Sequence, residues 1–182
     1  MEMIKMSENR VDPTVAGLFL VGLITLFFGL LGVLLYTEYD GAFSLYSFVL
    51  AILLPLGIVF LVFAVSAIRC GNAFAAALFG FVGIALFGAM SGLTTGSEIA
   101  FFLIGVFFIL FGLVAFLIGA PKLLAILLIF VALIYVFVGV FVYGAGDDPL
   151  IWTLVFGVFG LLAGALATYM AIALSTEKLP VF

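Results

Sequence analysis

Residues that could carry chemistry are few in this chain of 182 residues, and they are spread thinly along it. There is no histidine, and the one cysteine is Cys70. The polar side chains inside or beside apolar stretches are Thr25, Ser66, Asn72, Ser91, Thr94, Tyr135, Tyr143, Thr153, Thr168 and Tyr169. A hydrolase or a metal enzyme needs paired acids or clustered His and Cys ligands. The sequence offers no such cluster, so we expect no enzymatic activity, no metal site and no cofactor.

The isolated polar residues and the charge balance argue against further classes of protein. A single hydroxyl inside a helix commonly donates to a backbone carbonyl one turn earlier, so we expect these hydroxyls to be satisfied locally. Cys70 alone cannot form a disulfide within the chain. Five scattered basic residues make no phosphate-binding surface, so we expect no nucleic-acid partner. The apolar stretches also contain no acid of the kind that ion-coupled carriers use as a proton relay.

Composition places the chain in a membrane. Hydrophobic residues make up 69% and charged residues 8%, whereas soluble domains carry about 25% charged residues. Six stretches carry no charge: 13–37, 41–68, 70–97, 99–121, 123–146 and 149–176. Each has 23–28 residues, and a helix needs about 20 to cross the bilayer. We therefore predict an all-α integral membrane protein: a domain of six transmembrane helices over 13–175, with tails over 1–12 and 176–182.

The charges predict the orientation of these helices. Six crossings place every basic residue on one side: Lys5, Arg10, Arg69, Lys122 and Lys178. The loops on the opposite side contain acids and no base: Glu38, Asp40, Glu98, Asp147 and Asp148. Short cytoplasmic loops are enriched in Lys and Arg. We therefore expect both termini in the cytoplasm.

Small residues at helical spacing predict close packing. In the stretch 69–92 the turn residues Gly71 and Asn72 precede a face made of Ala76, Gly80 and Gly83, and Asn72 is placed to cap the helix. Such a bare face either lets a neighbouring backbone approach or leaves room for a solute path. Gly22, Gly29 and Gly32 lie roughly on one face of the first span, and the sixth span carries Gly157, Gly160 and Gly164. In the fourth span Gly105, Gly112 and Gly119 are seven residues apart, a heptad that predicts a close helix–helix contact.

Three motifs, taken in order, resemble one family. The chain has Asp12–Leu18 (DPTVAGL), then Gly71–Phe74 (GNAF) followed by Phe79 and Gly83, then Gly160–Ala171 (GLLAGALATYMA). They resemble the Asn-Pro-Ala-Pro-Leu-Gly-Leu signature of helix 1, the Gly-Asn-Thr-Phe…Phe…Gly of helix 3 and the helix 6 pattern of the acetate uptake transporter family. That family includes the bacterial succinate–acetate permeases and the yeast acetate transporters. The resemblance implies one path per protomer and a ring of six protomers.

The same resemblance assigns residues to the path. In the family a Phe of helix 1, a Tyr of helix 3 and a Leu of helix 5 narrow it, and the matching positions here are Val21, Val82 and Phe130. The other motif positions are Asp12, Pro13, Gly17, Phe60, Asn72 and Tyr169. Phe60 stands where the family commonly has Gln, and Asp12 stands where the signature has Asn. Near the inner mouth, Asp12 would disfavour a bare anion.

These observations lead to an expected function. We expect a channel or transporter for a small monocarboxylate, acetate first, in the bilayer of a prokaryotic cytoplasmic membrane. Because no basic residue lies inside the spans, the acid would pass together with its proton. Two alternatives remain open: a pore for a small neutral solute such as a gas, an amine or an amide, and a structural membrane protein whose glycine faces serve only assembly.

Overall fold

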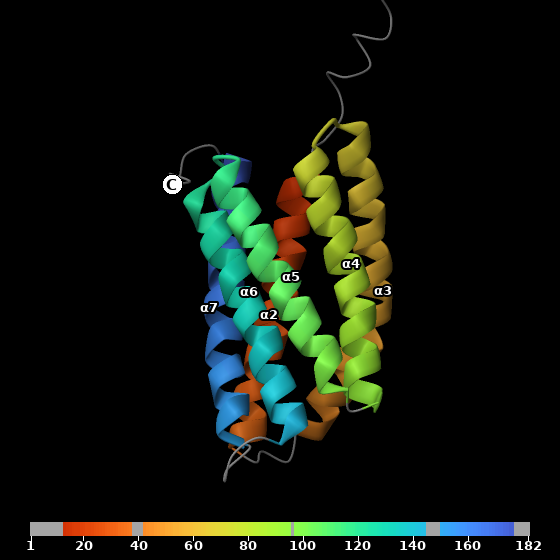
Figure 1. Cartoon of the computed structure of the whole chain (residues 1–182), viewed down its shortest axis with the longest axis vertical. Coiled ribbons are helices and arrows are strands. Elements are labelled where there is room, and N and C mark those ends of the chain that lie inside the picture. Colours follow the sequence, from red (N-terminus) through yellow and green to blue (C-terminus); the bar gives the residue numbers. More distant parts are fainter. Residues whose placement is uncertain (1–12, 38–41, 96, 145–149, 177–182) are drawn as a thin grey trace, which may run out of the picture.

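The computed structural model describes residues 13–37, 42–95, 97–144 and 150–176. Its helices are α2 (Thr14–Tyr36), α3 (Ala42–Arg69), α4 (Ala73–Thr95), α5 (Glu98–Leu117), α6 (Lys122–Tyr143) and α7 (Leu150–Thr176). All six are long and apolar enough to cross a membrane. The predicted all-α architecture with six spans is therefore confirmed (Figure 1). The first tail, with Asp12, and residues 177–182 lie outside the described residues.

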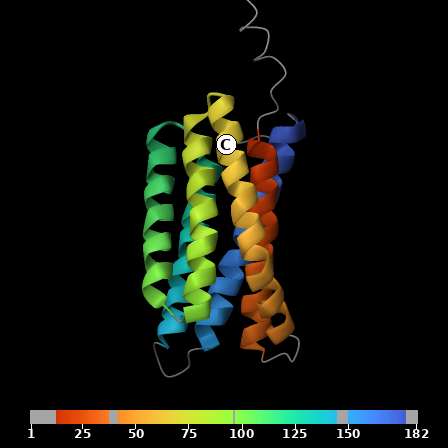
Figure 2. The ribbon, with the colours of Figure 1, turned by 90° about the vertical axis from the view of Figure 1, so that its right-hand side faces the viewer.

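The six helices form a closed ring. Each packs against its neighbours in the sequence, and α7 returns to pack against α2 (Figures 1 and 2). The contacts of α2 with α7, α5 with α6, and α3 with α4 are the extensive ones, whereas α2 with α3 and α4 with α5 meet over little surface. The α3–α4 hairpin is therefore the most loosely attached part of the ring.

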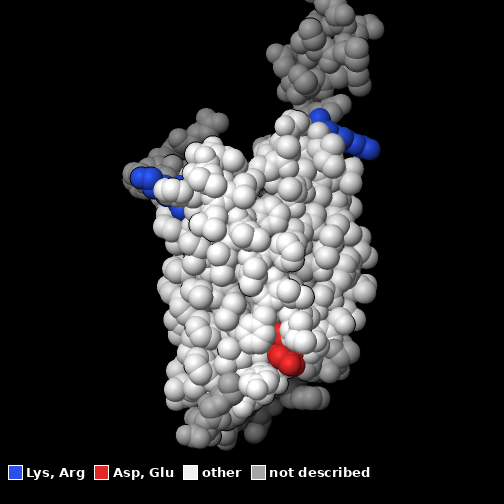
Figure 3. Space-filling model, viewed as in Figure 1, with Lys and Arg blue, Asp and Glu red and all other residues white. Residues whose placement is uncertain are grey.

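The described charges separate along the ring axis. Arg69, at the end of α3, and Lys122, at the start of α6, lie at one end, which we call the basic end (Figure 3). Glu98, at the start of α5, lies at the opposite, acidic end. The first described helix begins and the last one ends at the basic end. By the positive-inside rule we expect the basic end to face the cytoplasm.

The first and last helices form the most intimate pair. Glycines of α2 face glycines of α7; they are Gly22, Gly29 and Gly32 on one side and Gly157, Gly160 and Gly164 on the other. A methyl group built on Gly29 would lie 2.6 Å from the backbone nitrogen of Leu161, and one on Gly160 would lie 2.6 Å from Cα of Gly29. Any larger residue would push the two backbones apart. We call this surface the α2–α7 glycine contact.

The bare face of α4 packs against α3. A methyl group on Gly83 would lie 2.9 Å from the carbonyl oxygen of Gly57, so the two backbones touch here. Gly80 is less crowded, because its nearest neighbour would be Cβ of Ala64 at 3.7 Å. Ala76, Gly80 and Gly83 line neither of the two hollows described below. The structure therefore supports the packing interpretation of this face.

Glycines of α5 meet α6 in the same way, with one correction to the predicted heptad. A methyl group on Gly105 would lie 2.7 Å from Cγ2 of Val136, and one on Gly112 would lie 3.4 Å from the carbonyl oxygen of Ala125. The third position, Gly119, is not in this contact because α5 already ends at Leu117. Gly119 has φ +72°, and a methyl group there would meet nothing within 4 Å.

Gly71 and Gly119 instead end helices at the basic end. Both have positive φ, 77° and 72°, a conformation that favours glycine. Each donates its N–H to the carbonyl three residues earlier, and the next N–H reaches the carbonyl five residues earlier. This is the Schellman arrangement, which satisfies the last carbonyls of a helix. After Gly71, Oδ1 of Asn72 accepts a 3.0 Å hydrogen bond from the N–H of Ala75, which confirms Asn72 as the cap of α4.

Candidate functional site

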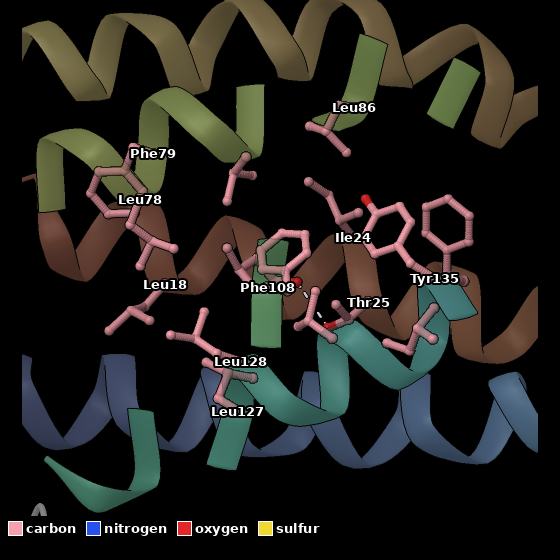
Figure 4. A pocket seen from close by; sticks show the side chains of 15 residues that line it. Leu18, Ile24, Thr25, Leu78, Phe79, Leu86, Phe108, Leu127, Leu128 and Tyr135 are labelled. Carbon is pink, nitrogen blue, oxygen red and sulfur yellow. Dashed lines mark hydrogen bonds between the residues drawn. The ribbon is translucent and has the colours of Figure 1, made fainter. Parts of the chain in front are cut away.

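An internal cavity of about 40 Å³ lies inside the ring (Figure 4). A water molecule needs about 10–15 Å³ of such space, so the cavity has room for about three. The residues around it are buried, with the exception of the half-buried Val21. They are Leu18, Val21, Ile24, Thr25 and Phe28 of α2; Leu78, Phe79, Val82 and Leu86 of α4; Phe108 of α5; and Leu127, Leu128, Val131, Ile134 and Tyr135 of α6.

The cavity runs along the helix axes through the middle of the ring. Its lining covers residues 18–28 of α2 and 127–135 of α6, which at 1.5 Å per residue is about 15 Å and about 12 Å. Leu18, Leu78 and Phe79 form its end nearer the basic side. Gly17 takes part in this closure, because a side chain there would collide with the ring of Phe79. The absence of a side chain at Gly17 thus lets Phe79 pack against α2.

The polar residues of the cavity wall are Thr25 and Tyr135. Oγ1 of Thr25 donates to the carbonyl oxygen of Val21 at 2.8 Å, as a local hydroxyl is expected to do. Thr153 and Thr168 make the same kind of bond within α7, at 2.6 and 2.8 Å. The expectation of local bonding is therefore confirmed for these three threonines. The described charged residues, in contrast, do not line the cavity.

The structure brings together two of the three residues assigned to the narrow point. Val21 of α2 and Val82 of α4 both line the cavity. Phe130 of α6 is not among the lining residues; it is half-buried and packs against Phe159 of α7, with ring centroids 5.8 Å apart. On α6 the next residue, Val131, lines the cavity instead. The wall opposite Val21 and Val82 is thus made by a different face of α6.

The other described motif positions, which are Pro13, Gly17, Phe60, Asn72 and Tyr169, do not line the cavity. Phe60 is fully buried against Phe79, at 6.0 Å between ring centroids, and so fills the α3–α4 contact. Pro13 precedes α2, and its carbonyl accepts the N–H of Gly17 at 2.8 Å. Tyr169 is half-buried on α7 and lines neither hollow.

Sequence reasoning missed most of the cavity wall. Leu128, Val131 and Tyr135 fall at i, i+3 and i+7, which is one helix face. This spacing could have linked Tyr135 to a face of α6, but apolar residues surround that helix on all sides. The spacing therefore does not tell the inward face from the lipid face.

A second hollow opens on the surface towards the basic end, between α2, α3 and α7. It is a groove of about 770 Å³ lined by Pro13, Val15, Ala16, Phe19, Val62, Phe63, Ser66, Ala171, Ile172 and Ser175. Phe19 and Val62 are 53% and 60% exposed, so the groove faces the lipid rather than the inside of the ring. The internal cavity is therefore the candidate site.

Comparisons with protein-family models, with curated proteins and with solved structures gave no match. The kinship with acetate uptake transporters thus stays a prediction from the motifs. Among the described residues, no group of His, Cys, Asp and Glu lies close enough to hold a metal ion. The candidate site is therefore a small internal cavity with an almost wholly apolar wall.

Proposed function

We propose that this six-span membrane protein passes a small uncharged solute across the bilayer, and that a small monocarboxylic acid in its neutral form, acetic acid first, is that solute. The observation that carries the proposal is the internal cavity, which lies along the axis of a closed ring of helices. Its wall is apolar apart from two hydroxyl-bearing residues. An enzymatic role has no such support, because the wall carries no acid, base or thiol.

The balance of two free energies favours the neutral acid over its anion. A carboxylic acid with a pKa of about 4 costs roughly 4 kcal/mol to protonate at pH 7. An unpaired charge moved into an apolar interior costs about 20 kcal/mol in the ideal limit and still several kcal/mol after relaxation. With no described positive charge on the wall, protonation is the smaller cost. The acid would therefore carry its proton through the protein.

Vesicles that enclose a pH-sensitive dye test the proposal. Entry of the neutral acid acidifies the lumen, whereas entry of the anion alone builds a membrane potential without acidification. Neutral acids also cross lipid unaided, so the relevant quantity is the acidification rate in excess of protein-free vesicles. We expect this excess to rise about tenfold from pH 7 to pH 6, with the protonated fraction. No excess for any small acid would refute monocarboxylate transport.

A pair of variants of α4 localises the path. Val82→Phe should fill the cavity and abolish the excess flux, since Val82 lines it. Ile84→Phe makes a similar enlargement two residues later on a side chain that is 62% exposed towards lipid, and it should leave the flux unchanged. Equal fluxes in the two variants, with both proteins assembled, would place the path elsewhere.

We further propose, from the resemblance, that six protomers form a ring in a prokaryotic cytoplasmic membrane. The outer surface is apolar and contacts lipid or another protomer; Leu117 and Phe116 of α5, for example, are 81% and 65% exposed. Native mass spectrometry of the detergent-solubilised protein should give six times the protomer mass. Monomers alone would refute the ring and leave the path within each protomer unaffected.

The alternative, a structural membrane protein without transport, is supported by the packing of the glycines. Every glycine face that the sequence displays is used inside the protomer, between α2 and α7, α3 and α4, or α5 and α6. A structural membrane protein without transport activity would need these helix contacts, and its internal cavity would have no function. In that case the flux experiment shows no excess for acids and none for neutral amides.

A further inference from the structure

The phenol ring of Tyr135 is held rigidly at the cavity wall. It stacks on Phe108 with ring centroids 5.5 Å apart and an interplanar angle of 13°, and on Phe101 at 6.5 Å and 25°. Both phenylalanines belong to α5 and are almost completely buried. Stacking against two fixed rings leaves the tyrosine little freedom. The position of its hydroxyl is therefore set by the contact between α5 and α6.

Among the described residues the hydroxyl of Tyr135 makes no hydrogen bond, and because no fully buried polar side-chain atom there lacks a partner, its oxygen keeps some area accessible to the cavity. Tyr135 as a whole is only 7% exposed, and its hydroxyl points into the cavity towards Ile24 and Leu86 (Figure 4). Buried hydroxyls of tyrosine normally find a partner, because leaving one unpaired costs free energy. The side chain faces an internal space with room for a partner of a few atoms.

The other polar side chain of the wall, Thr25, helps to show which hydrogen-bonding groups the partner must have. The hydrogen of Thr25 Oγ1 is already donated to Val21, so this oxygen can only accept. The wall is almost wholly apolar: its free donor is the O–H of Tyr135, and the hydroxyl of Thr25 offers no further donor. A carboxylate has no hydrogen to offer to an acceptor, whereas a protonated carboxylic acid and a primary amide have both a carbonyl oxygen and a hydrogen.

We propose that Tyr135 is the specificity-determining hydrogen-bond donor of the cavity, and that it binds the carbonyl oxygen of a neutral acid or amide of three or four heavy atoms. This inference rests on the proposed function and names the chemical group that the path selects. The size limit follows from a cavity with room for about three water molecules. The acceptor oxygen of Thr25, on the same wall, disfavours the anionic form.

The test compares Tyr135→Phe with the wild-type protein. Phenylalanine keeps the stacked ring and removes only the hydroxyl. Acetamide is the first probe, because it is uncharged at every pH used and its entry can be measured as swelling of the vesicles. The half-saturating concentration should rise about tenfold with no fall in maximal flux, since one hydrogen bond is lost from the bound state. Tyr143→Phe makes the same change at an exposed end of α6 and should alter neither quantity.

A binding measurement separates this inference from the proposed function. Acetamide should raise the melting temperature of the detergent-solubilised wild-type protein more than that of Tyr135→Phe, because a ligand stabilises the state that binds it. Flux with equal half-saturation in both proteins overturns the role of Tyr135 and leaves transport intact. A binding difference without flux overturns transport and leaves the role of Tyr135 intact. If neither flux nor a binding difference is observed, both the transport proposal and the role of Tyr135 are overturned.

Discussion

Replacing Gly29 by alanine should separate the first helix from the last. A methyl group at this position would lie 2.6 Å from the backbone nitrogen of Leu161, whereas ordinary contacts begin at 3.4 Å. The two backbones must therefore part by about 0.8 Å, the difference between these distances. The obstacle is backbone, which no change of rotamer can move. Overpacking of this kind costs about 1–3 kcal/mol.

Gly80→Ala is the matched control. It adds the same methyl group to another membrane-spanning helix, but its nearest neighbour is Cβ of Ala64 at 3.7 Å, an ordinary contact. Alanine is also the better helix former by about 0.5–1 kcal/mol. This gain is common to both substitutions, so Gly29→Ala should be less stable than Gly80→Ala by the overpacking cost of about 1–3 kcal/mol.

The measurement is the temperature at which half of the purified protein leaves its gel-filtration peak in detergent. For a chain of this length about 1 kcal/mol corresponds to roughly 2–4 °C. Gly29→Ala should have a midpoint about 2–12 °C below that of Gly80→Ala, and Gly80→Ala should equal the wild type or exceed it by a few degrees. A Gly29→Ala protein as stable as Gly80→Ala would refute the α2–α7 glycine contact. A large loss in Gly80→Ala would show that α3 and α4 pack more closely than described.

Three further predictions use other contacts. Asn72→Ala removes the cap of α4 and should cost about 1 kcal/mol, whereas Asn72→Asp should keep the protein stable; the same melting assay decides. Phe130→Ala should lower stability through lost packing on Phe159, by less than the ~3–5 kcal/mol of a fully buried Phe, while the ratio of butyrate to acetate flux stays unchanged. A cysteine at Ser97, in a Cys70→Ser background, should react with an impermeant reagent from outside intact cells, and native Cys70 should react only after lysis; external labelling of Cys70 would reverse the orientation.

The number and extent of the helices could be predicted from the sequence for a simple physical reason. A bilayer imposes a minimum apolar length, and charges are expensive within it, so charge-free stretches mark the spans. The turn at Gly71 and Asn72 could be predicted equally well, because a glycine in the left-handed conformation followed by a capping side chain depends only on neighbouring residues. The prediction that Gly119 belongs to the contact between α5 and its neighbour was wrong, because glycine both packs helices and ends them.

The partners of each helix could not be predicted from the sequence. The glycine faces of α2 and α7 were visible in the spacing, but spacing gives a face and not the helix that covers it. In a membrane, lipid is as apolar as the protein core, so burial leaves no compositional trace. Leu86 faces the cavity and Ile84 faces lipid, yet both are ordinary aliphatic residues of α4.

The inward face of α6 shows how much a shift of one residue changes the direction of a side chain. One residue along a helix turns the side chain by about 100°. Counting from motifs in other helices reached Phe130, which faces α7, whereas Val131 faces the cavity. Tyr135 was noticed as an isolated hydroxyl, but its lack of a partner and its aim into the cavity depend on the placement of α5.

The pairing of α2 with α7 also fixes the order of events during biosynthesis. More than one hundred residues separate the end of α2 at Tyr36 from the start of α7 at Leu150. At about 5–20 residues per second the ribosome needs on the order of 10 s to make them. Throughout that interval the glycine face of α2 lies in the membrane before α7, the helix that packs against it, has been made. The ring closes only when the last span enters the bilayer, so every chain terminated before Leu150 lacks the helix that covers the glycine face of α2.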